Sequence, residues 1–275
     1  MGAVNSVLNT LFDLLCAPLA RLNPWWAMAF LSLLTGLLML LVFRFTSNQK
    51  GIRRTKDRIK GHLLEFRLFK DSLGVTLQAF GNILVQNLRY LGHALKPLLV
   101  MIIPLLLILA QLNARFGYRP LRPGEQVLLK VKLARETNPL DLDMSIVPSS
   151  GFTVETPPLR IEEESEIDWR LRAVEPGRHG IVLRWPGQSV VKTMDIGPPG
   201  LSPLAPLTTN REFFNQLFNP ADRPLPKSVP LDSIELMYPG RSLRFLGMNI
   251  HWLLAFFVLS LIFGFSLKGL FKVEI

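Results

Sequence analysis

The sequence predicts an integral membrane protein: three membrane-spanning helices, a cytoplasmic helical hairpin, and an all-β domain with immunoglobulin-like sandwich architecture on the opposite side. Three observations predict this fold class. They are three uncharged apolar stretches, one strongly basic loop, and a series of short segments in which apolar and polar residues alternate. The chain has 275 residues, of which 49% are hydrophobic, and its mean hydropathy is +0.29. That length allows two modest domains, and that hydropathy favours membrane spans.

Each apolar stretch is long enough, or nearly so, to cross a hydrocarbon core of ~30 Å as a helix. Trp25–Phe43, Pro97–Ala114 and Phe245–Leu267 contain 19, 18 and 23 residues without Asp, Glu, Lys or Arg. A buried core helix is the alternative, and it is strongest for the second stretch, which Pro104 interrupts. We expect that span to begin at Pro97, because proline suits the first turn of a helix.

The distribution of positive charge predicts the topology. Residues 44–96 hold 11 Lys/Arg against three Asp/Glu, whereas residues 113–244 hold 17 against 16. Loops rich in Lys and Arg stay in the cytoplasm. The N-terminus and residues 113–244 are therefore expected outside, with residues 44–96 and the tail from Lys268 inside, in the inner membrane of a bacterium. The basic loop directly abuts a span, which favours anionic lipid headgroups over nucleic acid as its partner.

The predicted segments follow from these patterns. They are an outer interfacial amphipathic helix (1–23), a first span (24–45), a basic cytoplasmic hairpin (46–95), a second span (96–114), a β-sandwich (120–199), a proline-rich outer connector (200–244), and a third span with a short tail (245–275).

The basic segment carries apolar residues at heptad spacing. Ile52, Ile59, Phe66 and Leu73 recur every seven residues, and a second set comprises Leu77, Phe80, Leu84, Leu88 and Leu91. Two such stripes separated by a short turn predict an antiparallel coiled-coil hairpin. One continuous amphipathic helix on the membrane surface is the alternative.

The outer domain shows alternation typical of strands. Val127–Leu133, Leu142–Ile146, Ile167–Ala173, Ile181–Trp185 and Val190–Ile196 each place apolar residues at every second position, between turn sequences rich in Gly, Pro, Asn and Ser. Trp169 is in phase with its apolar neighbours and is predicted to be core. Residues 198–244 contain nine prolines and are predicted to form neither a sheet nor a helix bundle. Cys16 is the single cysteine, so an intrachain disulfide is excluded.

We expect no enzyme, and no catalytic, cofactor or metal site. The four histidines lack the spacing of zinc motifs, and phosphate-binding and nucleophile motifs are missing. The acidic run at residues 162–168 favours a solvated strand edge over a divalent-cation site.

Arg44 is the leading candidate for function, because it ends the first span. It is interpreted either as an anchor that reaches the interface or as a cation facing a wet groove. Residues expected to contact a client in such a groove are Arg44, Asn48, Gln49, Gln111, Asn113 and His251. Helix capping for Gln111 and Asn113, and simple hydration for His251, are the alternatives.

The order of segments, with Arg44 at the end of the first span and the run Lys96-Pro97-Leu98-Leu99-Val100-Met101-Ile102-Ile103-Pro104-Leu105-Leu106, resembles the YidC/Oxa/Alb insertase superfamily, especially its three-span branch. The resemblance covers residues 1–113 and, weakly, 245–275.

The resemblance implies a membrane protein insertase or chaperone whose polar groove assists client segments, with Arg44 near the groove arginine. Two features depart from the family pattern. The β-domain lies between the second and third spans, and a long basic tail is missing. The alternative function is a structural subunit of a larger hetero-oligomer, which docks partners through the sandwich and the hairpin.

The topology is testable with cysteines introduced at Ser72 and Ser189. The charge asymmetry predicts that an impermeant thiol reagent added from outside labels position 189 and not position 72. Labelling of both positions from the same side would overturn the three-span arrangement.

Overall fold

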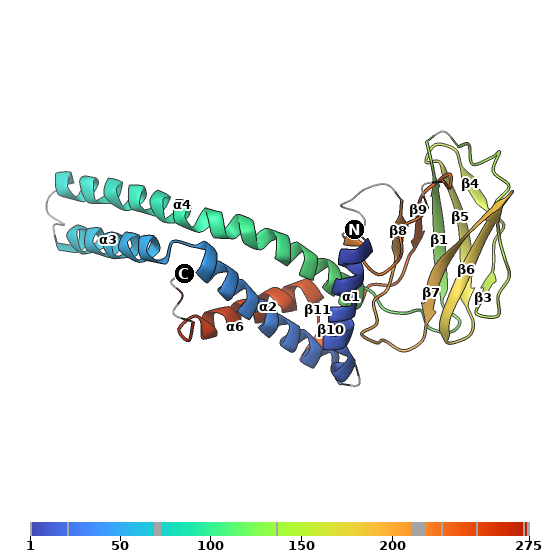
Figure 1. Cartoon of the computed structure of the whole chain (residues 1–275), viewed down its shortest axis with the longest axis horizontal. Helices are drawn as coiled ribbons and strands as arrows, with labels where there is room; N and C mark the ends of the chain where they lie inside the picture. Colours follow the sequence, from blue (N-terminus) through green and yellow to red (C-terminus); the bar gives the residue numbers. More distant parts are fainter. Residues whose placement is uncertain are drawn as a thin grey trace. The chain divides into compact units, whose positions relative to one another are not determined.

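The computed structural model describes residues 2–20, 22–68, 73–135, 137–210, 218–226, 228–245, 247–271 and 273, and Ser72 lies outside these ranges. The chain forms two compact units (Figure 1). A helical unit comprises residues 28–106 and 253–275. A second unit comprises residues 1–27 and 107–252 and contains the β-domain.

The main helices are α2 (Pro24–Thr46), α3 (Gln49–Leu68), α4 (Leu73–Leu112) and α6 (Trp252–Leu267). In the described part of the chain, two helical stretches, Pro24–Thr46 and Phe80–Gly117, are long and apolar enough to cross a membrane. Helix α6 is apolar along its length but has 16 residues, which corresponds to about 24 Å and falls short of the ~30 Å hydrocarbon core.

The prediction that a new helix begins at Pro97 is wrong. Helix α4 runs without interruption for 40 residues and contains both Pro97 and Pro104 in its interior. A proline removes one backbone donor and clashes with the preceding turn. The residues around Pro97, which include Ala94, Leu95, Leu98 and Leu99, are strong helix formers, and the helix continues through it.

Helices α3 and α4 lie alongside each other in opposite directions (Figure 1), and they are separate helices rather than one. Asn48 begins α3, because its Oδ1 accepts a hydrogen bond from the Gly51 N–H at 2.9 Å. Ile52 of the first predicted stripe is fully buried. Phe66 and Leu73 are outside the set of side chains that the structure describes.

The second predicted stripe does not pair with α3. Its residues Leu77, Phe80, Leu84, Leu88 and Leu91 are exposed by 56–74% of their surface. The coiled-coil prediction is therefore wrong for this face of α4. Seven of the 20 residues of α3 are Lys or Arg, and its Leu63, Leu64 and Leu68 are themselves 51–75% exposed, so the apolar residues of the two helices do not cover each other.

The β-domain contains two sheets. Their strands are β1 (Gln126–Leu133), β2 (Ser145–Ile146), β3 (Phe152–Val154), β4 (Leu159–Ile161), β5 (Glu166–Ala173), β6 (Gly177–Trp185), β7 (Gln188–Ile196), β8 (Leu207–Thr209) and β9 (Leu231–Leu236). One sheet has the order β3-β5-β1-β9-β8, with β4 also paired to β5, and the other has the order β2-β6-β7. Inward-facing residues of both sheets form one hydrophobic cluster, so the domain is a β-sandwich.

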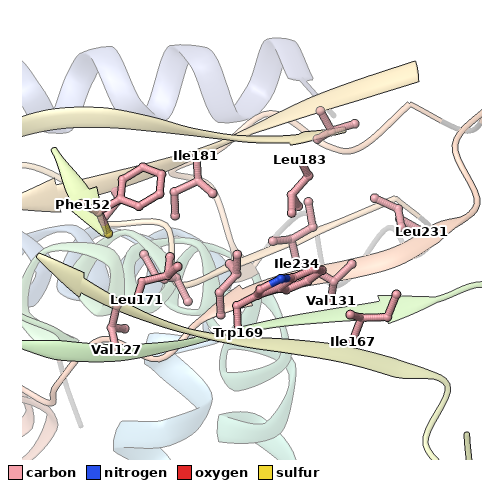
Figure 2. Close-up of a cluster of buried hydrophobic side chains, with 14 of the residues drawn as sticks. Val127, Val131, Phe152, Ile167, Trp169, Leu171, Ile181, Leu183, Leu231 and Ile234 are labelled. Carbon is pink, nitrogen blue, oxygen red and sulfur yellow. The ribbon is translucent and has the colours of Figure 1, made fainter. Parts of the chain in front are cut away.

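Trp169 lies in this core with 2% of its surface exposed, which confirms its predicted position. It pairs with Leu129 across the β1–β5 ladder. Figure 2 shows its indole among the side chains of Val131, Leu171 and Ile234. The alternation in the sequence therefore gives the correct register, because every second side chain of a strand points to the same face.

The prediction of an outer connector without sheet structure is wrong. Strand β9 pairs with β1 in the centre of the larger sheet, where Val131 lies opposite Ile234, and β8 pairs with β9. Pro206 and Pro230 immediately precede these strands, so the prolines bound the strands without interrupting them. Proline content averaged over the whole segment concealed this arrangement. Residues 211–217 of this connector are outside the described residues.

The start of the third span is also corrected. Residues 243–250 contain a hairpin of β10 (Leu243–Phe245) and β11 (Met248–Ile250), and the helix begins only at Trp252. Gly247 adopts a φ of +83°, which suits a tight hairpin turn. Trp25 contacts this hairpin, since its Nε1 donates to the Arg244 carbonyl at 2.7 Å. The missing charge in residues 245–251 therefore does not indicate a helix.

Replacement of Trp169 by alanine empties a large core site and is expected to lower the free energy of unfolding by about 3–5 kcal/mol. The measurement is denaturant unfolding of a fragment that contains every strand of the sandwich, residues 118–245. Val191→Ala, at a side chain that is 61% exposed, is the control and should change stability by less than about 0.5 kcal/mol. An unchanged transition for Trp169→Ala would contradict the core described here.

Candidate functional site

The helical unit contains an apolar groove of about 360 Å³ between three helices. Its lining comes from α2 (Thr35, Gly36, Met39, Leu40, Phe43), α4 (Leu91, Ala94, Leu95, Leu98, Met101, Leu105) and α6 (Phe256, Phe257, Ser260, Leu261, Gly264, Phe265). Thr35 is already satisfied, because its Oγ1 donates to the Leu31 carbonyl at 2.8 Å. The Ser260 hydroxyl is buried and has no hydrogen-bond partner within the described part of the chain. The accessible surface of the groove is thus apolar, and the Ser260 hydroxyl lies beneath it.

Small residues bring two walls of this groove together. A side-chain carbon added at Gly36 would lie 3.1 Å from the carbonyl oxygen of Ser260, so α2 and α6 approach each other closely there. Close approach at glycine is a common means of packing helices in lipid. The groove therefore depends on Gly36, and larger residues at this position would push α2 and α6 apart.

The groove continues along α4 as an exposed stripe. Leu91, Leu95 and Leu98 line the groove, and Leu77, Phe80, Leu84 and Leu88 extend the same i, i+3/i+4 series toward the hairpin. One face of a single helix therefore carries exposed apolar side chains from the hairpin to the groove. We name the residues from Leu77 to Leu88 the leucine stripe.

The structure does not bring the six predicted client-contact residues together in this groove. Arg44 is exposed in the last turn of α2, where a cation complements the helix dipole. Asn48 is exposed and caps α3, and Gln49 donates from its Nε2 to the Ser47 hydroxyl. Arg44, Asn48, Gln49, Gln111, Asn113 and His251 are all outside the groove lining described above.

Gln111 has a different setting from the one predicted. It is almost fully buried, its Nε2 donates to Asn9 Oδ1 at 2.7 Å, and its Oε1 accepts from Arg115 Nη1 at 2.7 Å. Asn113 is half-buried and contacts Gly117, while His251 is exposed, with its ring 5.8 Å from that of Trp252. These residues are in the unit that contains the β-domain.

Arg115 is a buried residue that the sequence reasoning missed. Its side chain has no exposed surface, and its Nη2 donates to Asp13 Oδ1 at 2.6 Å. Its guanidinium also lies 5.6 Å from the centre of the Phe12 ring. The N-terminal helix α1 (Gly2–Cys16) is thereby tied to the end of α4. The spacing of four between Gln111 and Arg115, at the end of an apolar helix, is the signal that could have identified the pair.

A second arginine extends the same network. Arg241 Nη1 donates to the carbonyls of Arg115 at 3.1 Å and Gly200 at 2.6 Å. Desolvation lowers the pKa of Arg241, and the ring of Phe116 lies 5.6 Å from its guanidinium. The turn after α4 (Asn113–Gly117) is therefore joined to both the N-terminal helix and the segment that follows β7.

A larger groove, of about 1230 Å³, lies in the same unit as the β-domain. It is lined by polar residues of α1 (Asn5, Ser6, Asn9, Thr10), by β7 (Ser189, Val190, Val191, Thr193), by β8 (Leu207, Thr208, Thr209) and by residues 219–226. We name it the strand-edge groove, because β7 and β8 are both at the edges of their sheets.

Lys192 holds the two edges of this groove together. Its side chain is fully buried, and its Nζ donates to Ala205 O at 2.6 Å, to the Thr208 hydroxyl and to Asp222 Oδ2 at 3.3 Å. Burial lowers the pKa of Lys192 to about 8, and the Asp222 carboxylate partly offsets this effect. A lysine between Val190 and Met194, at a position whose phase is inward, is the sequence signal that was overlooked.

The lowered pKa of Lys192 predicts a pH dependence of stability. Between pH 8 and 10.5 the unfolded chain binds more protons at this lysine than the folded chain does, so stability rises with pH in this window. The free energy of unfolding of residues 118–245 should increase by about 2 kcal/mol from pH 8 to pH 9.5. Chemical denaturation at several pH values measures it.

The matched variant for this experiment is Lys192→Met, which should show a smaller rise over the same pH range. The upper limit of pH 9.5 avoids Tyr238, whose pKa burial raises and whose ionisation in the unfolded chain acts in the opposite direction. Equal pH profiles for the two proteins would show that the Lys192 amine does not titrate in this window.

No family model matches the chain, and no curated protein matches it. Two solved structures show partial likeness, domains 4 and 5 of the S-layer protein SbsC and a longer form of the same protein, at 16% and 18% identity. Each covers 30% of this chain with a TM-score of 0.23, and the matched part spans 48% and 12% of those chains. This chain is thus similar to them over less than half of their length.

Proposed function

We propose that this protein is a non-enzymatic membrane insertase or chaperone that holds the hydrophobic segment of a client membrane protein in its apolar groove. The observation that carries the proposal is the continuity of the leucine stripe with the groove on one face of α4. A hydrophobic segment loses its contact with water progressively along such a path, and each buried Å² of apolar surface contributes about 25 cal/mol.

We also propose how the helices and the β-domain are arranged relative to the membrane. Helix α6, with its 16 apolar residues, serves as a third span, and the sandwich is immunoglobulin-like in architecture. The hairpin and the C-terminus are cytoplasmic, and the β-domain is outside the inner membrane of a bacterium. The seven Lys/Arg residues of α3 support contact with anionic lipid headgroups beside the leucine stripe.

The chemistry of the groove modifies the mechanism that the sequence suggests. A polar groove would lower the cost of moving hydrophilic segments through lipid. The groove between α2, α4 and α6 instead offers apolar side chains, and the Ser260 hydroxyl in its lining is buried. It favours recognition of an apolar helix, whose small residues can approach closely.

The second candidate function is a structural subunit of a larger membrane complex. The Arg115 network favours it, because buried and bonded charge fixes α1 rigidly to the end of α4. In this case a permanent partner helix covers the leucine stripe, and the β-domain docks another partner outside. Co-purification in fixed stoichiometry supports a subunit, whereas transient clients support a chaperone.

A photo-reactive residue tests the groove directly. Benzoylphenylalanine at Met101, which lines the groove, should cross-link to the hydrophobic segment of a single-span client during insertion into vesicles that contain the protein. The same residue at Leu99, which is 58% exposed on α4 and is outside the groove lining, should cross-link much less. Ala94→Trp fills the groove and should reduce both cross-linking and insertion several-fold, while Leu99→Trp should not.

Arg44 provides a separate arm of this test. An interfacial anchor works through charge alone, so Arg44→Lys should preserve insertion. A client-contacting arginine uses its planar five-donor fork, which lysine cannot reproduce, and then both Arg44→Lys and Arg44→Ala should impair insertion with normal expression and topology. Insertion that never depends on the protein would contradict the chaperone proposal and favour the structural subunit.

A further inference from the structure

Main-chain N–H and C=O groups of β7 line the strand-edge groove, and the hydrogen bonds at Asp195 show which way they point. The Asp195 N–H donates to the Tyr238 hydroxyl at 2.8 Å, and the Asp195 carbonyl accepts from the Leu121 N–H at 3.1 Å. Both partners lie on the side of β7 away from β6. The N–H and C=O of one strand residue point to the same side, and those of the next residue point to the other side. Ser189, Val191 and Thr193 therefore also direct their main-chain groups away from β6.

These three residues all line the groove. Leu121 and Tyr238 cover the edge of β7 at Asp195, and within the described residues no strand pairs with the edge from Ser189 to Thr193. The open edge is about 13 Å long, at ~3.3 Å per residue. It presents three N–H donors and three C=O acceptors at ladder spacing.

Strand β8 contributes to the same groove from the other sheet. Pro206 O accepts from the Leu236 N–H, and the Asn210 N–H donates to Asp232 O, so even-numbered residues face β9. Leu207 therefore directs its main-chain groups outward, into the groove that its side chain also lines. The Lys192 side chain reaches from β7 to Ala205 and Thr208 and fixes the positions of the two edges.

We propose that the strand-edge groove binds an extended segment of another polypeptide, which adds as a strand to the free edge of β7. Exposed strand edges are used in this way by peptide-binding domains, where main-chain hydrogen bonds give affinity and flanking side chains give specificity. Natural proteins usually protect an edge with charge, proline or a bulge. Ser189, Val191 and Thr193 carry none of these protections on their side chains, and the charge within this edge, Lys192, points inward, where Ala205 and Asp222 already accept its hydrogen bonds.

The lining defines the chemistry of the bound segment. Hydroxyl and amide side chains of α1 face it on one side, and Val191, with 61% of its surface exposed, offers an apolar contact. The charged residues of the lining are Asp222, which pairs with Lys192 at 3.3 Å, and Arg223. The other polar residues of the lining are uncharged, which favours an extended, mainly uncharged segment with Ser, Thr and Asn alternating with Val or Ile. This inference does not depend on the groove of the helical unit.

The test uses the full-length protein in detergent micelles and a phage-displayed library of random 12-residue peptides. Selection should enrich alternating, uncharged sequences. Binding of an enriched synthetic peptide should slow hydrogen exchange at the amides of Ser189, Val191 and Thr193, and leave those of Val190 and Lys192, which face β6, unchanged. Amides at 189–193 that are already protected in the free protein would overturn the proposal, because the edge would then be covered.

Val191→Pro is the decisive variant. Proline is tolerated at an edge position whose N–H points away from the sheet, and it removes one donor from the ladder. It should weaken peptide binding roughly tenfold or more while the thermal transition stays unchanged. Val191→Thr retains the N–H and a β-branched shape and should bind normally.

Three results would overturn the proposal. They are equal binding by Val191→Pro, failure to enrich any sequence, and self-association of the protein that Val191→Pro abolishes, which would make a second copy the occupant. If Val191→Pro unfolds, the exchange footprint on the unmodified protein decides alone. Protection confined to the outward amides supports strand addition, and protection elsewhere contradicts it.

Discussion

The unit that contains the β-domain depends on the hydrogen bonds and the ion pair of the fully buried Arg115 guanidinium. A buried cation that loses its partners destabilises a protein by several kcal/mol, so Asp13, Gln111 and the Phe12 ring must stay in place around it. Asp13 lies 102 residues before Arg115 in the sequence, so this contact joins distant parts of the chain. Arg241 repeats the arrangement by bonding the carbonyl of Arg115 itself. Positions of α1, the end of α4 and the segment after β7 are therefore set by one connected group of charges.

Lys192 has the same role inside the sandwich. An amine in a core position requires three acceptors, and Ala205, Thr208 and Asp222 supply them from segments beyond its own sheet. Hydrophobic burial determines which faces of the strands meet, but it tolerates sliding. The three hydrogen bonds of the buried Lys192 ammonium do not allow the strands to slide, and they fix the edge of β7 against the edge of β8.

Local patterns in the sequence correctly predicted the features that depend on residues close together in the chain. The phase of Trp169 and the uncharged core of α2 follow from alternation and from the distribution of charge. Errors arose where the partner is distant in sequence. Strand β9 becomes a strand by pairing with β1, and the leucine stripe of α4 remains exposed although the apolar residues of α3 were expected to cover it. Arg115 and Lys192 were missed for the same reason, because their charged partners are distant in the sequence: Asp13 lies 102 residues from Arg115, and Asp222 lies 30 residues from Lys192.

The pairing of β9 with β1 has a consequence for synthesis of the protein. Strand β1 ends at Leu133, and its central partner begins at Leu231, about 100 residues later. At a synthesis rate of ~5–20 residues per second, β1 waits roughly 5–20 s for this partner. During that interval one side of a central strand is unpaired, and the sandwich cannot close until β9 has been made, which ends at Leu236, 16 residues before α6 begins at Trp252. Completion of the β-domain is therefore followed closely by synthesis of the last apolar helix.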